Sequence, residues 1–264
     1  MPVHEQLAER EHGPLLKADN ATFTRRSGQV DLNTASCDDS VMANIRISHS
    51  EDRVATITLD RPHKKNALSM DLREEMVDAL EHLRTDDSVN CLIVTGEGDA
   101  FSAGFDLSEF TNDDEAFQKR LWDSSDRFHH ALLRFPLPII AAVNGVALAG
   151  GFDLAVLCDL RIASRTAHFG HPERSFGDVV YRPLLDLVGG AVARDLCLTG
   201  RTIDAHEAHE LGLVSRVVAS EELIGTVEEM ASRIAAFPRE MSIRIKAKII
   251  ASVSVDPSTR TLDL

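Results

Sequence analysis

The spacing of apolar residues predicts short strands and amphipathic helices in alternation. Apolar side chains take every second position in residues 44–49 and again in 53–59, which predicts two β-strands. Farther along, apolar residues recur at intervals of four, four and three, as on one face of a helix. Ser69 or Asp71 would cap this helix, which would end near Arg84. The folded part of the chain therefore opens with two strands and a helix.

Continuous apolar runs follow at 90–95, 138–143 and 160–163, and such runs are typical of strands that are covered on both faces. Helical periodicity returns between and after these runs, at residues 113–134, 150–158, 190–199, 204–211, 220–236 and 239–252. Strands that alternate with helices indicate an α/β fold in layers, with a largely parallel sheet and right-handed crossovers. Helices alone follow the last strand, so we expect a C-terminal helical region.

The N-terminal part of the chain differs in composition from the rest. It is rich in Asp, Asn, Ser, Thr, Glu and Arg, and it holds neither helical nor strand periodicity for long. Such a segment buries too little apolar surface to offset the entropy lost on folding. We therefore expect residues 1–41 to be a disordered extension and residues 42–264 to form the folded domain.

The overall composition excludes several classes of protein. A chain of 264 residues, 44% of them apolar, is long enough for one α/β domain of the larger kind. The formal net charge of −14 argues against a general nucleic-acid binder, which needs clustered Lys and Arg. No apolar run approaches the length of a membrane span, and the N-terminus lacks a secretory signal, so we expect no membrane segment.

The four cysteines are scattered along the chain and form no CxxC pair. Cys91 and Cys158 lie in apolar runs, where a thiol is typical of the core, and Cys37 and Cys197 stand apart from them. A disulfide framework would need a denser pattern. The cysteines therefore favour a reducing, cytoplasmic setting.

Two glycine-containing loops, at residues 96–107 and 144–153, follow buried strands. Ligands of α/β sheets usually bind beyond the carboxyl ends of strands, and small residues let a ligand approach the backbone closely. The second loop opens a helix, whose first N–H groups lack internal partners and would stabilise an oxyanion. Alternatively, the glycines only turn the chain. Neither loop has the pattern of a dinucleotide-binding loop or of a P-loop.

Two acidic residues are candidates for acid–base chemistry. Asp153 lies inside an otherwise apolar helix, and Glu173 follows a proline just past a strand-like segment. An acid in apolar surroundings is costly unless it is paired or used, and two acids in different environments can divide the roles of general acid and base. The alternative is structural: Asp153 would cap or pair, and Glu173 would be a surface acid.

Histidines give only a weak indication of a metal site. His168 and His171 are close in sequence, but no third ligand is placed beside them, so a structural role is favoured. His206 and His209 do not form the HExxH pattern, and they lie on an amphipathic helix with a solvated face. We expect no metal.

Several motifs, in order and in spacing, resemble the enoyl-CoA hydratase/isomerase (crotonase) family. The matching segments are Arg61-Pro62, Asn66-Ala67-Leu68, residues 101–107 (FSAGFDL), 138–145 (PIIAAVNG), 149–155 (AGGFDLA), Cys158-Asp159, 169–173 (FGHPE), 198–200 (LTG) and 212–214 (GLV). The resemblance covers roughly residues 43–250. It implies that family's α/β fold, a ClpP/crotonase spiral of ββα units with C-terminal helices.

The resemblance also implies a site. The backbone N–H groups of Phe105 and Gly150 would form an oxyanion hole for the thioester oxygen of an acyl-CoA as an enolate develops, and Asp153 and Glu173 would be the catalytic acids. No cofactor is implied beyond the coenzyme A of the substrate, and members are usually homotrimers or dimers of trimers. The expected contacts to substrate and CoA are Lys64, Lys65, Ala67, Ala103, Phe105, Asp106, Leu107 and Gly150, with Lys64 or Lys65 at a phosphate.

The chain departs from the family pattern in three places. Asp153 stands where hydratases have Glu and is one methylene shorter; a dienoyl-CoA isomerase branch has the same Asp, but its further Asp is replaced here by Tyr181. The segment 177–185 is shorter than the hydratase loop and lacks its paired glycines, which leaves the acyl preference open. The helical region that ends at Leu264 is shorter than in many members.

Three functions follow, of which the first is favoured. As a hydratase, the chain would use Glu173 with Asp153 to add water to a trans-2-enoyl-CoA while Phe105 and Gly150 hold the enolate. As an enoyl- or dienoyl-CoA double-bond isomerase, it would move a proton between carbons with the same residues. As a non-catalytic acyl-CoA-binding protein, it would keep the CoA site without productive acid geometry.

Overall fold

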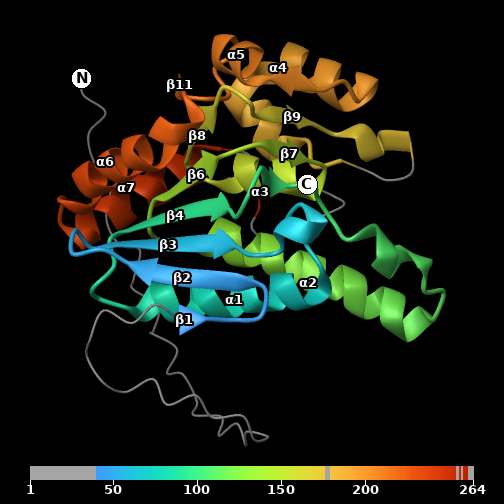
Figure 1. Cartoon of the computed structure of the whole chain (residues 1–264), viewed down its shortest axis with the longest axis horizontal. Coiled ribbons are helices and arrows are strands. Elements are labelled where there is room, and N and C mark those ends of the chain that lie inside the picture. Colours follow the sequence, from blue (N-terminus) through green and yellow to red (C-terminus); the bar gives the residue numbers. More distant parts are fainter. Residues whose placement is uncertain (1–39, 176–178, 254–255, 257, 261–264) are drawn as a thin grey trace, which may run out of the picture. The chain divides into compact units, whose positions relative to one another are not determined.

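A seven-stranded sheet forms the centre of the fold in the computed structural model, which describes residues 40–175, 179–253, 256 and 258–260. All of these residues belong to one structural unit. Figure 1 shows the sheet, in which the strands lie in the order β1-β2-β3-β4-β6-β8-β11. Their bounds are β1 (Ser40–Val41), β2 (Ile45–His49), β3 (Val54–Leu59), β4 (Cys91–Gly96), β6 (Ile139–Val143), β8 (Leu160–Ser164) and β11 (Arg216–Val218).

The sheet is antiparallel at one edge and parallel elsewhere. β2 pairs antiparallel with both β1 and β3, whereas β3, β4, β6, β8 and β11 pair in parallel. The predicted strands at 44–49 and 53–59 form the antiparallel pair, and the prediction of a largely parallel sheet is confirmed. Parallel strands are covered on both faces by their crossover connections, which explains why their apolar runs are continuous.

A second sheet, with the strand order β10-β9-β7-β5, accompanies the first. β5, β7 and β9 are parallel, and each comes between a strand of the larger sheet and an α-helix. The chain therefore repeats a ββα unit, which confirms the predicted spiral. β5 and β7 lie inside the predicted loops 96–107 and 144–153, because three residues are too few to show alternation. The bounds are β5 (Ala100–Ser102), β7 (Val146–Leu148), β9 (His168–Gly170) and β10 (Ile203–Asp204).

The helices of the described residues match the predicted positions within a few residues, except at one end of α4. Ser69 is the N-cap of α1, because its Oγ accepts a hydrogen bond from the N–H of Leu72 (3.3 Å). The α-helices are α1 (Met70–Thr85), α2 (Glu115–Arg134), α3 (Gly150–Leu157), α4 (Arg182–Thr199), α5 (Ala205–Glu210), α6 (Leu223–Ala235) and α7 (Arg239–Ser252). The 3₁₀-helices are η1 (Pro62–Lys64), η2 (Leu107–Thr111), η3 (Pro172–Ser175) and η4 (Ser220–Glu222).

Helix α4 begins eight residues before the predicted start at residue 190. Pro183 lies in its first turn, where the missing N–H of proline costs no hydrogen bond. Gly189 interrupts the helix with a positive φ of 75°, so the predicted segment 190–199 is the second half of α4. The periodicity of the sequence therefore predicted only the half of α4 that follows Gly189.

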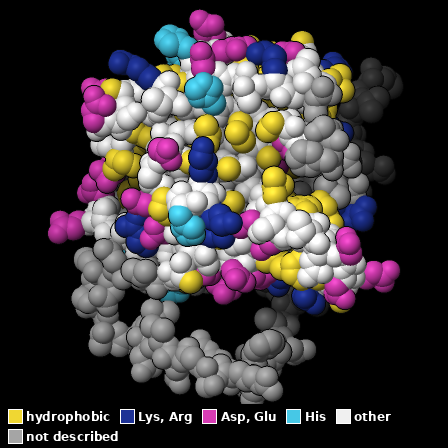
Figure 2. Space-filling view, turned by 45° about the vertical axis from the view of Figure 1, so that its right-hand side comes forward, with side chains coloured by type: hydrophobic (Ala, Val, Ile, Leu, Met, Phe, Trp, Pro, Cys, Tyr) yellow, Lys and Arg dark blue, Asp and Glu magenta, His cyan; other side chains and the backbone are white. Residues whose placement is uncertain are grey.

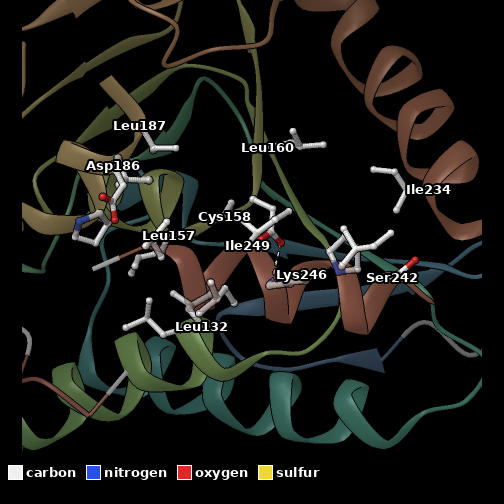
Figure 3. A pocket seen from close by; sticks show the side chains of 18 of the residues that line it. Leu132, Leu157, Cys158, Leu160, Asp186, Leu187, Ile234, Ser242, Lys246 and Ile249 are labelled. Atoms are coloured by element: carbon white, nitrogen blue, oxygen red, sulfur yellow. Dashed lines mark ion pairs between the residues drawn. The ribbon is translucent and has the colours of Figure 1, made fainter. Parts of the chain in front are cut away.

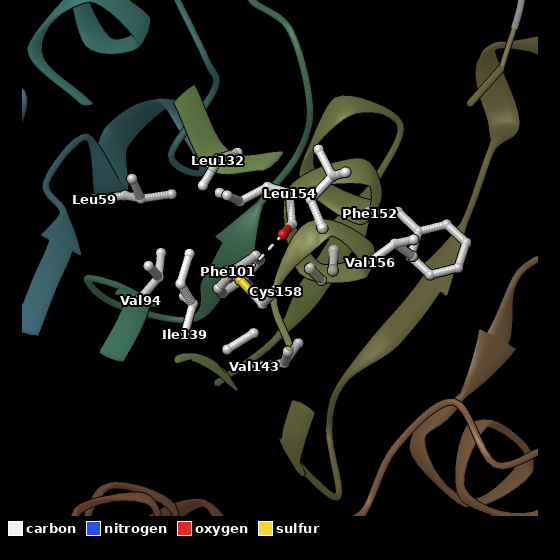
Figure 4. Packing of buried hydrophobic residues seen from close by; sticks show 14 of the residues in the cluster. Leu59, Val94, Phe101, Leu132, Ile139, Val143, Phe152, Leu154, Val156 and Cys158 are labelled. Atoms are coloured by element: carbon white, nitrogen blue, oxygen red, sulfur yellow. Dashed lines mark hydrogen bonds between the residues drawn. The ribbon is translucent and has the colours of Figure 1, made fainter. Parts of the chain in front are cut away.

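Two hydrophobic layers cover the larger sheet, and alternate residues of β4 point into them. Leu92 and Val94 belong to the layer that packs against α1, α2 and α3, while Cys91 and Ile93 belong to the layer under α6. Figure 4 shows the first layer, in which Leu154 on α3 lies nearer Val94 and Ile139 of the larger sheet than Phe152 does. The ring of Phe152 packs instead against that of Phe169 on β9, with ring centroids 5.8 Å apart. Burial of this kind fixes the position of α3, and with it the backbone at the start of that helix.

On the face drawn in Figure 2, acidic side chains are spread widely and basic ones stand among them. None of the helices that the structure describes is both long enough and apolar enough to cross a bilayer. Cys91 and Cys158 are buried free thiols, as predicted. The predicted extension of residues 1–41 is wrong at its end, because residues 40 and 41 form β1 and pair with β2. Residues 1–39, with Cys37, lie outside the described residues.

Candidate active site

The two glycine loops come into contact beside the smaller sheet. β5 ends at Ser102 and β7 at Leu148, and these strands pair in parallel, so their carboxyl ends lie together. A Cβ added to Gly104 would lie 2.7 Å from the Cβ of Ala149 and 3.1 Å from the backbone nitrogen of Gly150. Gly104 also has a φ of 92°. A side chain at this position would therefore push the two loops apart.

The segment 65–68 holds the first loop in place through its backbone. The carbonyl of Lys65 accepts a hydrogen bond from the N–H of Ala103 (2.9 Å), and the N–H of Leu68 donates to the carbonyl of Gly104 (2.8 Å). Leu68 and Phe105 form an isolated parallel β-bridge. The predicted CoA-contacting segment and the predicted oxyanion loop are thus one hydrogen-bonded unit.

A buried asparagine completes this unit. Asn66 has no exposed surface and takes a left-handed backbone conformation with a φ of 54°. Its Oδ1 accepts from the N–H of Arg61 (3.0 Å), and its Nδ2 donates to the carbonyls of Glu97 (2.9 Å) and Ala100 (2.7 Å). The amide therefore bridges both loop segments, and a hydrophobic side chain of the same size would leave these backbone groups unpaired.

The second loop is strained immediately before α3. Ala149 has a φ of 52° and a ψ of −131°, a region that residues with a Cβ rarely adopt, at a cost of about 1–3 kcal/mol. Its N–H donates to the carbonyl of Gly170 (2.9 Å), and its carbonyl accepts from Phe152 (2.7 Å) and Asp153 (3.0 Å). These bonds hold the unusual conformation, which turns the chain sharply into the helix.

Two backbone N–H groups at this contact, those of Phe105 and Gly150, form no hydrogen bond within the described part of the protein. Gly150 is the first residue of α3, where helical geometry leaves the N–H free and the helix dipole is positive. The ring of Phe105 lies directly on Gly150, because a Cβ added there would be 2.9 Å from two ring carbons. Two unpaired donors therefore stand on adjoining loops, a favourable arrangement for an anionic oxygen.

The two predicted acids are brought together by a histidine. His171 is fully buried; its Nδ1 is 3.0 Å from Oε1 of Glu173, and its Nε2 is 3.6 Å from Oδ1 of Asp153. Asp153 is itself 7% exposed. Three polar atoms of this acid–histidine cluster have no hydrogen-bond partner among the described residues, namely Oδ1 of Asp153, Nε2 of His171 and Oε2 of Glu173. They are the groups with which a water or substrate could bond.

Burial and mutual charge set the protonation of the cluster. Burial raises the pKa of Asp153 to about 7, although His171 lowers it and Glu173 adds to the rise. Burial alone would lower the pKa of His171, but Asp153 and Glu173 outweigh it and raise that pKa. Burial raises the pKa of Cys197 on α4 to about 11, and the negative charges of Asp153 and Glu173 add to the rise. Cys197 is therefore a neutral thiol at neutral pH.

The predicted CoA-contacting lysines lie on the surface beside these loops. Lys64 ends η1 and Lys65 follows it, and both side chains are exposed and available to an anion. Ala67 is buried and Ala103 is partly buried. Leu107 is 64% exposed at the start of η2 and is therefore open to a ligand.

The side chain of Asp106 is hydrogen-bonded within the loop region. Its Oδ2 accepts from Nη2 of Arg61 (3.0 Å), and its Oδ1 accepts from Oγ of Ser108 (2.6 Å). Burial would raise the pKa of Asp106, but the bonds from Ser108 and Arg61 lower it overall. Arg61 also donates to the carbonyl of Ala67 (2.6 Å). Asp106 was predicted to contact CoA, and its side chain is engaged in holding the two loop segments together.

A separate cavity of about 450 Å³ lies against the far end of α3 (Figure 3). It is largely apolar, and Lys246 and Asp159 form an ion pair of 2.7 Å at its wall. Val156 and Leu157 line it, whereas none of the predicted site residues does. In the part of the chain that the structure describes, no group of three or more His, Cys, Asp or Glu side chains is placed to hold a metal.

Sequence reasoning missed the role of two residues at this site. His171 was weighed only as a metal ligand or structural residue, although its position two residues before Glu173 brings it next to that acid. Arg73 was not considered, although it is fully buried beneath Phe105. The signal for Arg73 was its place three residues before Met76, on the edge of the apolar face of α1.

Comparison with known proteins decides the family. The family model for enoyl-CoA hydratase/isomerase matches residues 49–264. The chain belongs to the enoyl-CoA hydratase/isomerase family. The predicted resemblance is thereby confirmed, and with it the class of enzyme, since relatives are named as hydratases.

Several relatives of this family member are named as hydratases. It is 37% identical over 193 residues to the short-chain-enoyl-CoA hydratase of Clostridium acetobutylicum, covering 71% of this chain and 74% of the relative. The crotonyl-CoA hydratase of Syntrophomonas wolfei gives the same identity and coverage. The crystal structure of an enoyl-CoA hydratase from Bacillus anthracis superposes with a TM-score of 0.77 at 32% identity, covering 81% of this chain and 84% of that one. The crotonase-like fold is thus confirmed.

Proposed function

We propose that this family member hydrates trans-2-enoyl-CoA thioesters. The observation that carries the proposal is the pair of unpaired N–H groups of Phe105 and Gly150 on adjoining loops, next to a buried acid pair. Addition of water to the double bond moves an electron pair to the thioester oxygen. Donors that are already in place for that oxygen stabilise the enolate without reorganisation.

The acid pair supplies the proton chemistry. As the water oxygen bonds to the β-carbon, Glu173 takes a proton from that water, and the electron pair of the double bond moves to the thioester. Asp153, whose pKa is raised to about 7, then gives a proton to the α-carbon as the enolate collapses. The product is a 3-hydroxyacyl-CoA, and Glu173 is left protonated while Asp153 is ionised.

His171 returns the two acids to their starting state. Its Nδ1 faces Glu173 at 3.0 Å and its Nε2 faces Asp153 at 3.6 Å. In the neutral imidazole with its proton on Nε2, Nδ1 accepts the proton of Glu173, and Nε2 releases its own proton to Asp153 through a water between the two atoms. Exchange with solvent then returns the ring to its starting tautomer. Asp153 departs from the family pattern by its shorter side chain, and His171 connects this side chain to Glu173.

A spectrophotometric assay with crotonyl-CoA and a longer trans-2-enoyl-CoA tests the proposal. Hydration removes the absorbance of the conjugated thioester, and Glu173→Gln should lower kcat by roughly 10²–10⁴-fold. Glu229→Gln changes the same group on the exposed surface of α6 and should leave kcat unchanged. Hydration that persists in Glu173→Gln at the rate of the unchanged protein would show that the assignment is wrong.

Double-bond isomerisation is the second candidate, and the same histidine supports it. A connected pair of acids could take a proton from one carbon of an enoyl- or dienoyl-CoA and return it at another, and Asp153 is the residue of the dienoyl-CoA isomerase branch. The reaction in oxygen-18 water separates the two, because only hydration puts the label into the product. Tight acyl-CoA binding without any turnover would instead indicate a non-catalytic binding protein.

We also keep two predictions about the setting of the enzyme. The family resemblance implies a homotrimer or a dimer of trimers, which analytical ultracentrifugation would test. The scattered free thiols favour a cytoplasmic location. The substrate brings its own coenzyme A, so the proposed reaction uses no separate cofactor.

A further inference from the structure

A fully buried cation lies behind the contact between the two loops. Arg73, on α1, has no exposed surface and is the largest of the fully buried side chains that the structure describes. Its Nε (3.0 Å) and Nη2 (2.7 Å) donate to Oγ of Ser124, and Nη2 also donates to the carbonyl of Leu121 (3.3 Å). The carboxylate of Glu109 is 3.9 Å away, too far for a hydrogen bond. The charge is therefore only loosely paired.

The guanidinium faces the ring of Phe105. The Cζ atom of Arg73 is 4.5 Å from the ring centroid, within the range of a cation–π contact. The same ring touches Gly150, since a Cβ added there would lie 2.9 Å from two ring carbons. The ring therefore stands between the cation and the first residue of α3, and it transmits the position of Arg73 to Gly150.

Arg73 also holds the backbone that carries Phe105. Its Nη1 donates to the carbonyl of Leu68 (2.6 Å). Leu68 in turn donates to the carbonyl of Gly104 (2.8 Å) and forms the β-bridge with Phe105. Arg73 thus holds Leu68, whose backbone is hydrogen-bonded next to the N–H of Phe105. Through the ring of Phe105 it also contacts the surroundings of the N–H of Gly150.

We propose that Arg73 is a positioning residue for both backbone donors and that its charge favours the enolate over the ground-state thioester; this inference rests on the proposed oxyanion hole. A cation in a region without water acts over a longer range than one at the surface, because the local dielectric is low. Burial lowers the pKa of Arg73 to about 10, against the attraction of Glu109 and Glu74, so the side chain is charged at neutral pH.

A second buried arginine provides the contrast. Arg161 lies at the other end of α3 and is 4% exposed, and its guanidinium donates to the carbonyls of Leu213 (2.7 Å), Cys158 (2.6 Å) and Ala155 (3.2 Å). Its charge is satisfied by the C-terminal carbonyls of a helix and a neighbouring loop, as in an ordinary C-cap. It has no contact with Phe105 among those that the structure shows. Arg161 is therefore the matched structural control.

The test uses a bound chromophore as well as turnover. The thioester of 4-aminocinnamic acid with CoA absorbs at longer wavelength when its carbonyl is polarised, so its spectral shift reports the donors without any hydration. We expect Arg73→Met to lower kcat for crotonyl-CoA by roughly ten- to hundredfold with KM changed by less than about threefold. It should also remove most of the spectral shift, which a loss of packing alone would not do in a protein that still binds the probe. Arg161→Met should lower the melting temperature and keep the shift.

A further variant, Arg73→Lys, keeps the result decisive. Arg73→Lys retains a charge without the planar fork, so it should keep part of the spectral shift if charge matters and lose it if the hydrogen bonds matter alone. If Arg73→Met does not fold, Arg73→Lys carries the test. A folded Arg73 variant that binds the probe with the full shift and turns over normally would overturn the inference. If the unchanged protein binds the probe with a full spectral shift and yet hydrates no enoyl-CoA, that result would refute the proposed hydratase activity. The role of Arg73 could still be tested by the spectral shift.

Discussion

Nδ1 of His171 lies 3.0 Å from Oε1 of Glu173, at a position where the histidine has no exposed surface. The opposite ring nitrogen faces Asp153, so one imidazole is shared by two carboxyl groups. Because the three groups interact, their protons leave in steps that belong to the cluster and not to one residue. The acid–histidine cluster therefore determines over which pH range the proposed chemistry operates.

Replacement of His171 should move the pH profile. His171 lowers the pKa of Asp153 against the effect of burial, so His171→Gln should raise that pKa above its present value of about 7. If protonated Asp153 is the donor, the alkaline limb of the kcat/KM profile moves to higher pH. Loss of the proton path should also lower kcat by roughly tenfold. Steady-state rates with crotonyl-CoA at a series of pH values measure both effects.

The control for this prediction is His168→Gln, because His168 is exposed and lies on the same strand-to-helix segment. It should leave the profile where it is. An unchanged alkaline limb in His171→Gln would show that the histidine does not tune the acids, whatever its effect on kcat.

A methyl group on Gly150 should disable the proposed oxyanion hole. The added Cβ would be 2.9 Å from two carbons of the Phe105 ring, which is closer than real side chains pack. The ring or the helix must shift, and a displacement near one ångström is expected to lower kcat by roughly 10²-fold. Gly225→Ala is the matched control, because nothing lies within 4 Å of a Cβ there and α6 should become slightly more stable. Equal kcat values for Gly150→Ala and the unchanged protein would refute this placement of the donor.

The sequence was sufficient to predict the order of the main helices and of five strands of the larger sheet, and the positions of the two glycine loops. It did not predict β11, because only helices were expected after residue 163. Continuous apolar runs predicted β4, β6 and β8, and the N-cap of α1 was one of two named candidates. The smaller sheet was not predictable from periodicity, since its strands have two or three residues and depend on pairing with distant segments. The same limit explains why Ala149, with its positive φ, looked like any small residue of a loop.

The site likewise contains residues that the sequence predicted and residues that only the fold reveals. The sequence predicted Asp153 and Glu173 as candidate acids and Phe105 and Gly150 as neighbouring donors by resemblance, and the structure brings each pair close together. It could not predict the side chains behind them, because these come from α1 and α2, distant in the chain. The contact of Arg73 with Phe105 spans two elements whose juxtaposition only the fold creates.

Removal of the exposed lysines should weaken CoA binding without slowing the chemistry. Lys64 and Lys65 lie on the surface beside the loop that carries Phe105. Each exposed charge pair contributes about 0.2–1 kcal/mol, so the double variant to Ala should raise KM for crotonyl-CoA roughly two- to thirtyfold at unchanged kcat. Added salt should reduce the difference in KM between the double variant and the unchanged protein, because salt screens surface charges.

A truncated substrate and a distant lysine control this experiment. Crotonyl-pantetheine lacks the phosphates, so its KM should be the same for the double variant and for the unchanged protein. Lys248→Ala removes an exposed charge from α7 and should leave KM for crotonyl-CoA unaffected. A rise in KM for the phosphate-free substrate would mean that the lysines act through the loop and not through phosphate.

Asp153→Asn should stabilise the protein at alkaline pH while it abolishes hydration. The pKa of Asp153 is about 7 in the folded protein and 3.8 in its ordinary state, so the folded state holds a proton that the unfolded state has released. The free energy of unfolding therefore falls as the pH rises from about 4 to about 7. Above that window the buried carboxylate costs on the order of 4 kcal/mol, because each pKa unit is worth about 1.4 kcal/mol.

Asparagine has nearly the same shape and no charge, so it removes this cost. Urea unfolding at pH 5 and at pH 8.5 should show a gain in stability for Asp153→Asn that is larger at pH 8.5. The exposed Asp87→Asn on the loop after α1 should show no such pH dependence. A gain that is equal at both pH values would mean that the effect comes from packing, and that Asp153 is ionised in the folded protein across the whole range. In that case Asp153 could not be the proton donor near neutral pH, and the donor would have to be Glu173.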